Sequence, residues 1–248
     1  MSVRYLSVQL QGAVATVALK RPRAANRINQ AMALELAETC AELDAAADVR
    51  VVVITGEGAS FSVGWEPVRR GSALVQVAQA VSAVRKPVVA AINGDCLDQG
   101  LELALACDFR VTVPEAHFGI RHVASGLMPW DGGTQRLPRL VGRPQAIRLL
   151  LTAEVIDSQE ALHMGLVHHI ATDGDLHKSV AEITRRLLDG APIAAAYAKE
   201  AAMSGMDLTL DQGLRLEADL SILLHGTQDR AEGFSSFHER RKPRYLGQ

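Results

Sequence analysis

The stretch of residues 86–133 constrains the fold of this chain more than any other. An apolar run at 88–92 has the length and composition of a buried strand, and the turn pair Asn93-Gly94 closes it. A helix-like segment at 100–107 follows, apolar except for one acid, Glu102. Because burial in apolar surroundings shifts the pKa of an acid, this segment predicts a site for acid–base chemistry.

A second predicted strand, at 109–113, leads into a loop with three ionisable side chains: His117, His122 and Asp131. The two histidines are five residues apart, with no Cys or acid motif to complete a ligand set, so no metal site is expected. Asp131 is suited to cap the next helix. It is also suited to act as a second acid, or as a nucleophile at the mouth of a pocket.

Asp98 lies four residues before Glu102, so the two carboxyl groups would share one helix face if the helix began early enough. Two neighbouring acids would raise one pKa towards neutrality, which suits a general acid or base. A structural role for Glu102 is the alternative, and the sequence leaves both open.

The rest of the chain alternates strand-like and helix-like segments, which favours an α/β fold with covered sheets. Further strands are expected at 5–10, 14–19, 51–54 and 166–170. Helices are expected at 30–46, where Asn29 is the predicted cap, and at 73–84, 134–140, 144–151, 158–164, 176–188, 193–203 and 208–224. This order predicts a core at 1–194 and a helical C-terminal region at 195–248.

The composition excludes several classes of protein. The net charge of the 248 residues is −2, which argues against a nucleic-acid binder. No apolar run approaches the length of a membrane span, and the first residues do not read as a signal peptide. The three cysteines, Cys40, Cys96 and Cys107, are interpreted as reduced, mostly buried thiols. A cytoplasmic protein without a membrane partner is therefore expected.

Five ordered motifs resemble those of a single family. They are Leu19-Lys20-Arg21-Pro22 with Asn26; Phe61-Ser62-Val63-Gly64-Trp65-Glu66; residues 86–94; Glu102-Leu103-Ala104 with Cys107-Asp108 and Phe118-Gly119; and Gly132-Gly133-Thr134-Gln135-Arg136-Leu137. Across essentially its whole length, the chain resembles the crotonase (enoyl-CoA hydratase/isomerase) superfamily. One such scaffold hosts many chemistries, so the resemblance specifies the fold more closely than the reaction.

The resemblance implies a spiral of ββα units with a C-terminal helical region for trimerisation, and a homotrimer or a dimer of trimers. It implies an acyl-CoA thioester as substrate, with coenzyme A entering only as part of that substrate and no further cofactor. Two backbone N–H groups, by position those of Trp65 and Gln99, would hold the thioester oxygen as it becomes an enolate. Substrate and CoA contacts would come from Arg21, Arg23, Ala24, Val63, Gly64 and Gly100, and from the basic tail of a neighbouring subunit.

The chain also departs from the pattern of the family it resembles. Glu102 matches the first of the two glutamates of the hydratases, and His122 stands where the second would be. The family's three glycines are Asp98-Gln99-Gly100 here, so Gln99 would be strained if it adopted a conformation suited to glycine. Acids near the position of Asp131 serve in members that isomerise dienoyl-CoA or displace halide from aryl-CoA.

Three functions remain open from the sequence. The first is a hydratase or isomerase of an unsaturated acyl-CoA, including cyclic or dienoyl substrates, with Glu102, Asp131 and His122 as catalytic residues. The second is an acyl-CoA hydrolase or dehalogenase-like enzyme that uses Asp131. The third is a protein that binds CoA without catalysis.

Overall fold

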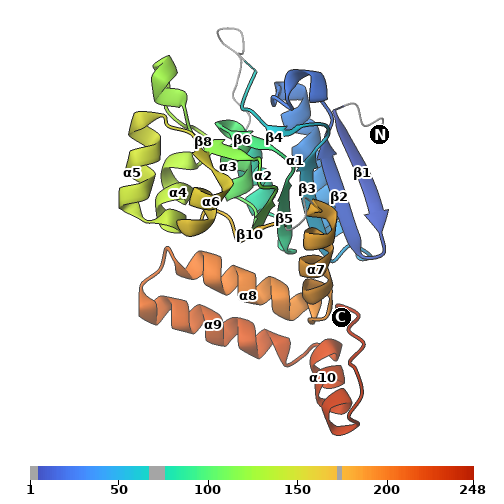
Figure 1. Ribbon diagram of the computed structural model, residues 1–248. Helices are drawn as coiled ribbons and strands as arrows, with labels where there is room; N and C mark the ends of the chain where they lie inside the picture. The colour runs from blue at the N-terminus through green and yellow to red at the C-terminus, as the bar shows by residue number, and fades with distance from the viewer. Residues whose placement is uncertain (1–4, 67–75, 172–174) are drawn as a thin grey trace.

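Two β-sheets form the centre of the computed structural model, which describes residues 5–66, 76–171 and 175–248 (Figure 1). The six-stranded sheet has the order β1 (Leu6–Gln11), β2 (Val14–Leu19), β3 (Val51–Gly56), β5 (Val88–Ile92), β7 (Phe109–Thr112) and β10 (His169–Ile170). Its first two strands form an antiparallel hairpin, and all later neighbours are parallel. The second sheet has the order β4 (Ser60–Ser62), β6 (Asp95–Leu97), β8 (His117–Gly119) and β9 (Ile156–Asp157).

Helices follow the strands and form the C-terminal end. In chain order they are η1 (Pro22–Ala24), α1 (Gln30–Ala45), α2 (Val77–Ser82), α3 (Gln99–Leu105), η2 (His122–Ser125), α4 (Gly133–Val141), α5 (Arg143–Thr152), α6 (Ser158–His163), α7 (Leu176–Leu188), α8 (Pro192–Gly205), α9 (Leu210–Leu224) and α10 (Gln228–His238). Figure 1 shows α8 and α9 side by side beneath the sheets, with α10 beyond them.

The chain repeats a ββα unit in which one strand joins each sheet. The units are β3–β4–α2, β5–β6–α3, and β7–β8 followed by η2 and α4. This repeat confirms the predicted fold class. The second strands are only three residues long, and the prediction of a loop at His117 was wrong, because that residue begins β8. So short a strand carries no hydrophobic period that could identify it.

The apolar runs are central strands because both of their faces are buried. Along β3, Val52 and Ile54 belong to one apolar cluster, whereas Val51 and Val53 belong to a second. Leu176 and Val180 of α7 also belong to the second cluster, so this helix covers that face of the sheet. A strand buried on both sides needs no polar alternation, which explains the continuous apolar sequence.

Most predicted elements lie within a residue or two of the observed ones. The cap of α1 is confirmed, because the Asn29 side chain accepts a hydrogen bond from the Met32 N–H at 2.8 Å. The strand expected at 166–170 is reduced to β10, and α10 was not predicted. Residues 73–75 of one expected helix lie outside the described residues. The expected border after residue 194 falls inside α8, and the division into two parts stays a prediction.

The C-terminal helices are attached to the core by a lysine of α8. The Lys199 ammonium donates hydrogen bonds to the Val84 and Lys86 carbonyls, at 2.8 and 3.0 Å, and to the Asp108 carboxylate at 2.7 Å. The three cysteines are free and buried, as expected. Among the described residues, no helix combines the length and the apolar character that crossing a membrane requires.

Candidate active site

Glu102 is the most deeply buried acid of the site. It lies in α3 with no exposed surface. Its Oε1 accepts hydrogen bonds from the backbone N–H groups of Asp131, at 2.9 Å, and Gly133, at 2.8 Å. Its Oε2 has no hydrogen-bond partner among the described residues. One carboxylate oxygen is therefore held in place, and the other is left for a reacting group.

Burial raises the pKa of Glu102 to about 7. The two backbone N–H donors oppose this by favouring the charged form, and the nearby charge of Asp131 adds to the rise. The group is thus poised to give and take a proton near neutral pH, as a general acid or base requires.

Asp98 does not share a face with Glu102, and the expected pair of acids is therefore wrong. Its carboxylate turns to Arg121, accepting from the backbone N–H at 2.6 Å and from Nη2 at 2.7 Å. Asp98 precedes the first residue of α3, with φ 52° and ψ −122°. The strained conformation therefore falls on Asp98, whereas Gln99 begins the helix without a positive φ.

His122 is the second buried titratable group beside Glu102. Its side chain is 3% exposed, and its Nε2 lies 3.8 Å from the Glu102 Oε2. The Gln99 side-chain amide nitrogen lies 2.6 Å from the same ring nitrogen. Among the described residues Nδ1 has no hydrogen-bond partner, and the Asp98 Oδ1 lies 3.9 Å from it. Burial lowers the pKa of His122, which favours the neutral ring, with one nitrogen as a hydrogen-bond donor and the other as an acceptor.

Two backbone donors come from segments that touch each other. The N–H groups of Trp65 and Gln99 have no acceptor within the part of the chain that the structure describes. Gly100 allows the close approach, since an added Cβ would lie 2.2 Å from the Ser62 carbonyl oxygen. The structure thus brings together the segments of both predicted oxyanion donors, and a Gln at 99 leaves its amide available.

Asp131 faces a different helix from the one expected. Its Oδ2 accepts from the N–H of Val77 at 2.9 Å, and its Oδ1 accepts from the N–H of Ala78 at 3.2 Å. Both oxygens therefore cap α2, whereas α4 begins after Gly132 without a side-chain cap. A cavity of about 830 Å³ borders Asp131 and Arg136, but neither Glu102 nor His122 lines it.

The predicted CoA-contact residues lie in and beside the loop from β2 to α1. Arg21 donates to the Arg27 carbonyl at 2.6 Å and forms an ion pair with Glu66 at 2.8 Å. Arg23 is exposed, and Ala24 is half-buried. This loop pairs with the segment of Val63 and Gly64 through the hydrogen bonds Val63 N to Ala25 O and Ile28 N to Gly64 O.

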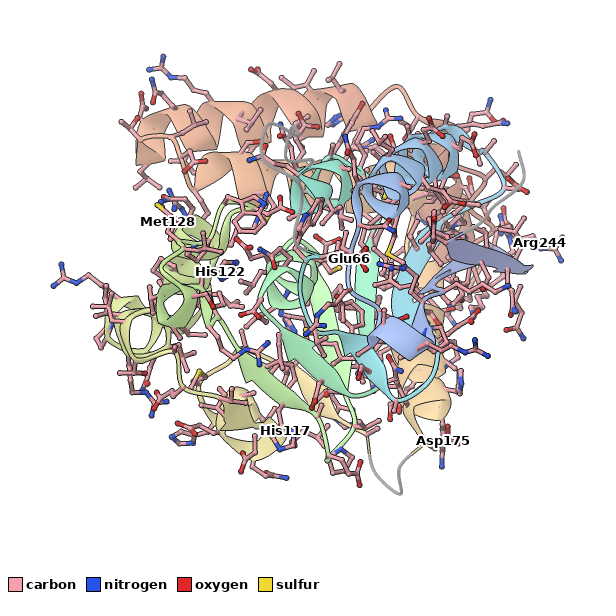
Figure 2. The ribbon with its side chains drawn as sticks, turned by 90° about the horizontal axis from the view of Figure 1, so that it is seen from above. Glu66, His117, His122, Met128, Asp175 and Arg244 are labelled. Atoms are coloured by element: carbon pink, nitrogen blue, oxygen red, sulfur yellow. The ribbon has the colours of Figure 1, made fainter. Side chains whose placement is uncertain are left out.

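His117 and the basic tail do not join the site of their own chain. Figure 2 shows His117 and Arg244 at the periphery of the view, whereas His122, whose side chain is 3% exposed, lies further in. His117 pairs with Asp95 in the second sheet at 2.9 Å. Within the described ranges, no cluster of His, Cys, Asp and Glu has the composition of a metal site.

Two residues contribute to the site that were not predicted from the sequence. Trp130 lies edge-on to both His122 and Trp65, with ring centroids 5.2 and 6.3 Å away. Arg136 donates from Nη1 to the Asp131 carbonyl at 2.9 Å. Arg136 belongs to a quoted motif and Trp130 lies two residues before one, but neither contact is visible before the chain is folded.

The fold and the site define an α/β protein with a fully buried glutamate of raised pKa and, among the described residues, two backbone N–H groups without an acceptor. Residues 9–248 match the family model described as enoyl-CoA hydratase/isomerase. The chain is 36% identical over 258 residues to a crotonyl-CoA hydratase of Syntrophomonas wolfei, covering 99% of both chains. It is 35% identical over 254 residues to a 2,3-dehydroadipyl-CoA hydratase of Escherichia coli, covering 98% of both.

A solved structure, the enoyl-CoA hydratase of Bacillus anthracis, superposes with a TM-score of 0.93 at 35% identity, covering 99% of this chain and 100% of that one. These likenesses extend over nearly the full length and include both sheets and the C-terminal helices. The chain belongs to the enoyl-CoA hydratase/isomerase family.

Proposed function

We propose that this chain is an enzyme that hydrates an unsaturated acyl-CoA through a thioester enolate. The observation that carries the proposal is Glu102, which is fully buried, has one free oxygen and has a pKa of about 7. The crotonyl-CoA and 2,3-dehydroadipyl-CoA hydratases among its relatives support an α,β-unsaturated thioester as the substrate class. No cofactor is proposed beyond the CoA carried by the substrate, and the proposed location is the cytoplasm.

In the proposed reaction, the oxygen of a water molecule bonds to C3 of the acyl group while Glu102 takes a proton from that water. The electrons of the C2–C3 double bond move to the thioester oxygen, where the Trp65 and Gln99 amides stabilise the enolate. Glu102 then returns the proton to C2, so that the product has gained one water. His122, neutral beside Glu102, orients that water.

The remaining site residues are proposed as substrate contacts. Arg21, Arg23 and Ala24 would meet the CoA moiety, and Val63, Gly64 and Gly100 would shape the channel to the two amides. The basic tail of a neighbouring subunit would add charge for the CoA phosphates, in a homotrimer or a dimer of trimers. Phosphates are bound by arginine through charge-assisted hydrogen bonds.

Isomerisation is the second candidate, and a specific observation favours it. Of Glu102 and Asp131, Glu102 has an oxygen without a hydrogen-bond partner among the described residues, whereas both Asp131 oxygens accept from α2. One base is sufficient to remove a proton from one carbon and return it to another through the same enolate. The hydrolase and the non-catalytic alternatives have less support, because neither of them needs a proton-transfer group of raised pKa at position 102.

A panel of enoyl-, dienoyl-, cyclic and aryl-CoA thioesters, followed by mass spectrometry, tests the proposal. A hydratase adds the mass of one water, an isomerase changes absorbance at constant mass, and a hydrolase releases free CoA. Glu102→Gln should lower kcat by about 10²- to 10⁴-fold, whereas Glu115→Gln, at an exposed loop position, should not. Full turnover by a folded Glu102→Gln enzyme would refute the assignment, and calorimetric binding without any conversion would favour a binding protein.

A further inference from the structure

Asp131 connects two elements that are distant in the sequence. Its carboxylate accepts the N–H groups of Val77 and Ala78, 54 and 53 residues earlier in the chain. Its own backbone N–H donates to the Glu102 Oε1. The same residue therefore holds the first turn of α2 on one side and the acid of the site on the other.

Further bonds hold α2 against the turn that contains Asp131. The Gln76 side chain donates to the Trp130 carbonyl at 3.0 Å, and the Arg136 Nη2 donates to the Ser82 hydroxyl at 3.2 Å. Arg136 also donates to the backbone carbonyl of Asp131. Both ends of α2 are thus bonded to residues 130–136, and Asp131 supplies the only carboxylate among these bonds.

The turn itself needs a glycine beside Asp131. Gly132 has φ 101°, and an added Cβ would lie 2.0 Å from the Arg136 Nη1. This conformation lets the backbone N–H groups of Asp131 and Gly133 both reach the Glu102 Oε1. The path of the backbone at this turn therefore decides where the acid points.

We propose that Asp131 is a positioning residue whose carboxylate fixes the turn to α2, so that the turn's backbone amides hold Glu102 in its reactive orientation. The proposal rests on the proposed role of Glu102. It differs from a nucleophile or second acid, either of which needs a carboxylate oxygen directed at the substrate. Both oxygens of Asp131 accept hydrogen bonds from α2 instead.

The negative charge of Asp131 also acts on Glu102 directly. The ionisable groups near Glu102 are Asp131 and Arg136 from the turn and α4, and His122 from η2, while the Asp98 carboxylate pairs with Arg121. Of these charges, Asp131 raises the pKa of Glu102 and Arg136 lowers it. Removing the charge of Asp131 should therefore lower the pKa of Glu102.

The test compares Asp131→Asn with Asp131→Ala. Asparagine keeps the size and one acceptor oxygen, which is enough for the Val77 and Ala78 N–H groups that both reach Oδ2. It loses the charge and the weaker second bond to Oδ1. In the pH profile of kcat/KM, the acid limb should move to lower pH in Asp131→Asn. In Asp131→Ala, losing the backbone hydrogen bonds that lower the pKa of Glu102 should oppose that shift. The alanine variant should also lose kcat on the order of ten- to a hundred-fold, because the turn is no longer held and Glu102 is displaced. KM should change much less than kcat.

An aspartate that caps a helix away from the candidate site serves as the control for Asp131. The Asp175 side chain caps α7 by accepting from the Lys178 N–H at 2.9 Å, and Figure 2 shows Asp175 far from His122. Asp175→Ala should lower thermal stability as the loss of a cap does but leave the acid limb in place. If Asp131→Ala kept the wild-type kcat, the positioning role would be wrong, and an unmoved acid limb in Asp131→Asn would disprove the effect of the Asp131 charge on Glu102.

A readout without substrate separates this proposal from the proposed function. The carbonyl stretch of protonated Glu102 can be assigned in the infrared spectrum by its loss in Glu102→Gln. Its titration midpoint should fall in Asp131→Asn even if no thioester in the panel is converted. A covalent acyl or aryl adduct on Asp131, or equal loss of kcat in the asparagine and alanine variants, would show a nucleophile instead.

Discussion

Asp98 has a backbone conformation that non-glycine residues rarely adopt, with φ 52° and ψ −122°. Such a conformation costs on the order of 1–3 kcal/mol and persists only where surrounding contacts offset that cost. Here its N–H donates to the Gly119 carbonyl, and its carboxylate accepts two hydrogen bonds from Arg121. The strain therefore lies one residue before the Gln99 donor, whose amide keeps helical geometry.

The pKa of Glu102 also affects stability. A folded-state pKa of about 7, above the ordinary 4.5, gives a contribution that is fully present below pH 4.5 and lost as the pH rises through 7. Glu102→Gln removes this dependence. The variant should therefore gain free energy of unfolding relative to the wild type, on the order of 2 kcal/mol, between pH 5 and pH 8.

Urea denaturation at the two pH values measures this difference. Glu115→Gln, at an exposed position, is the matched control and should show no such dependence. A pH-independent difference between Glu102→Gln and the wild type would mean that Glu102 titrates at its ordinary pKa in the folded protein.

Some site residues could be predicted from the sequence and others could not. Glu102 was identified because a single acid within an apolar helical segment is unusual by itself. The contacts of Asp131 could not be predicted, because its partners Val77 and Ala78 lie more than fifty residues earlier. The pairing of Asp98 with Arg121 is likewise a contact across 23 residues. Both depend on the folded path of the backbone.

At the scale of elements, the crossing of α3 over β4 fixes the distance between the two free amides. The contact point is Gly100, where an added Cβ would lie 2.2 Å from the Ser62 carbonyl oxygen. Gly100→Ala should lower stability by about 1–3 kcal/mol, because neither backbone has room to move. It should also lower kcat/KM, on the order of a hundred-fold, by displacing Gln99 from Trp65.

Thermal denaturation and steady-state kinetics measure the two effects. Gly205→Ala in α8 is the matched control, because an added Cβ there meets nothing within 4 Å. It should be neutral or slightly stabilising. Wild-type stability and turnover in Gly100→Ala would mean that the two segments are not in close contact.

The long strands could be predicted because they are continuous apolar runs, as at 51–54 and 88–92. The strands β4, β6 and β8 have three residues each and are defined by pairing with one another, which the local sequence does not encode. The helix α10 was missed because its residues, Gln228–His238, are mostly polar and only two of them, Asp229 and Ser236, are buried. Such a helix lacks the apolar stripe on which periodicity depends.

At the scale of the whole molecule, the position of the C-terminal helices depends strongly on one side chain. Lys199→Met removes three hydrogen bonds from α8 to the core, one of them to the Asp108 carboxylate. The variant should lose about 1.5–3 kcal/mol of stability, the range for a hydrogen bond to a charged group. Limited proteolysis should then cut faster between residues 192 and 224.

Lys178→Met, at an exposed position of α7, is the control and should be cut at the wild-type rate. Equal protection of Lys199→Met and the wild type would mean that apolar packing alone holds α8 and α9 in place.

The ββα repeat distributes the site over successive units of the chain. The first unit leads from β4 to Trp65, the second carries Gln99 and Glu102, and the third carries His122 and Asp131. Neighbouring units are joined by parallel strands. These strands pair through backbone N–H and C=O groups, so the pairing depends little on which side chains they carry. Recombination between relatives at the unit borders would therefore exchange one part of the site at a time while the sheets stay paired. Chimeric libraries built at these borders would explore new reactions with fewer misfolded members than libraries cut elsewhere.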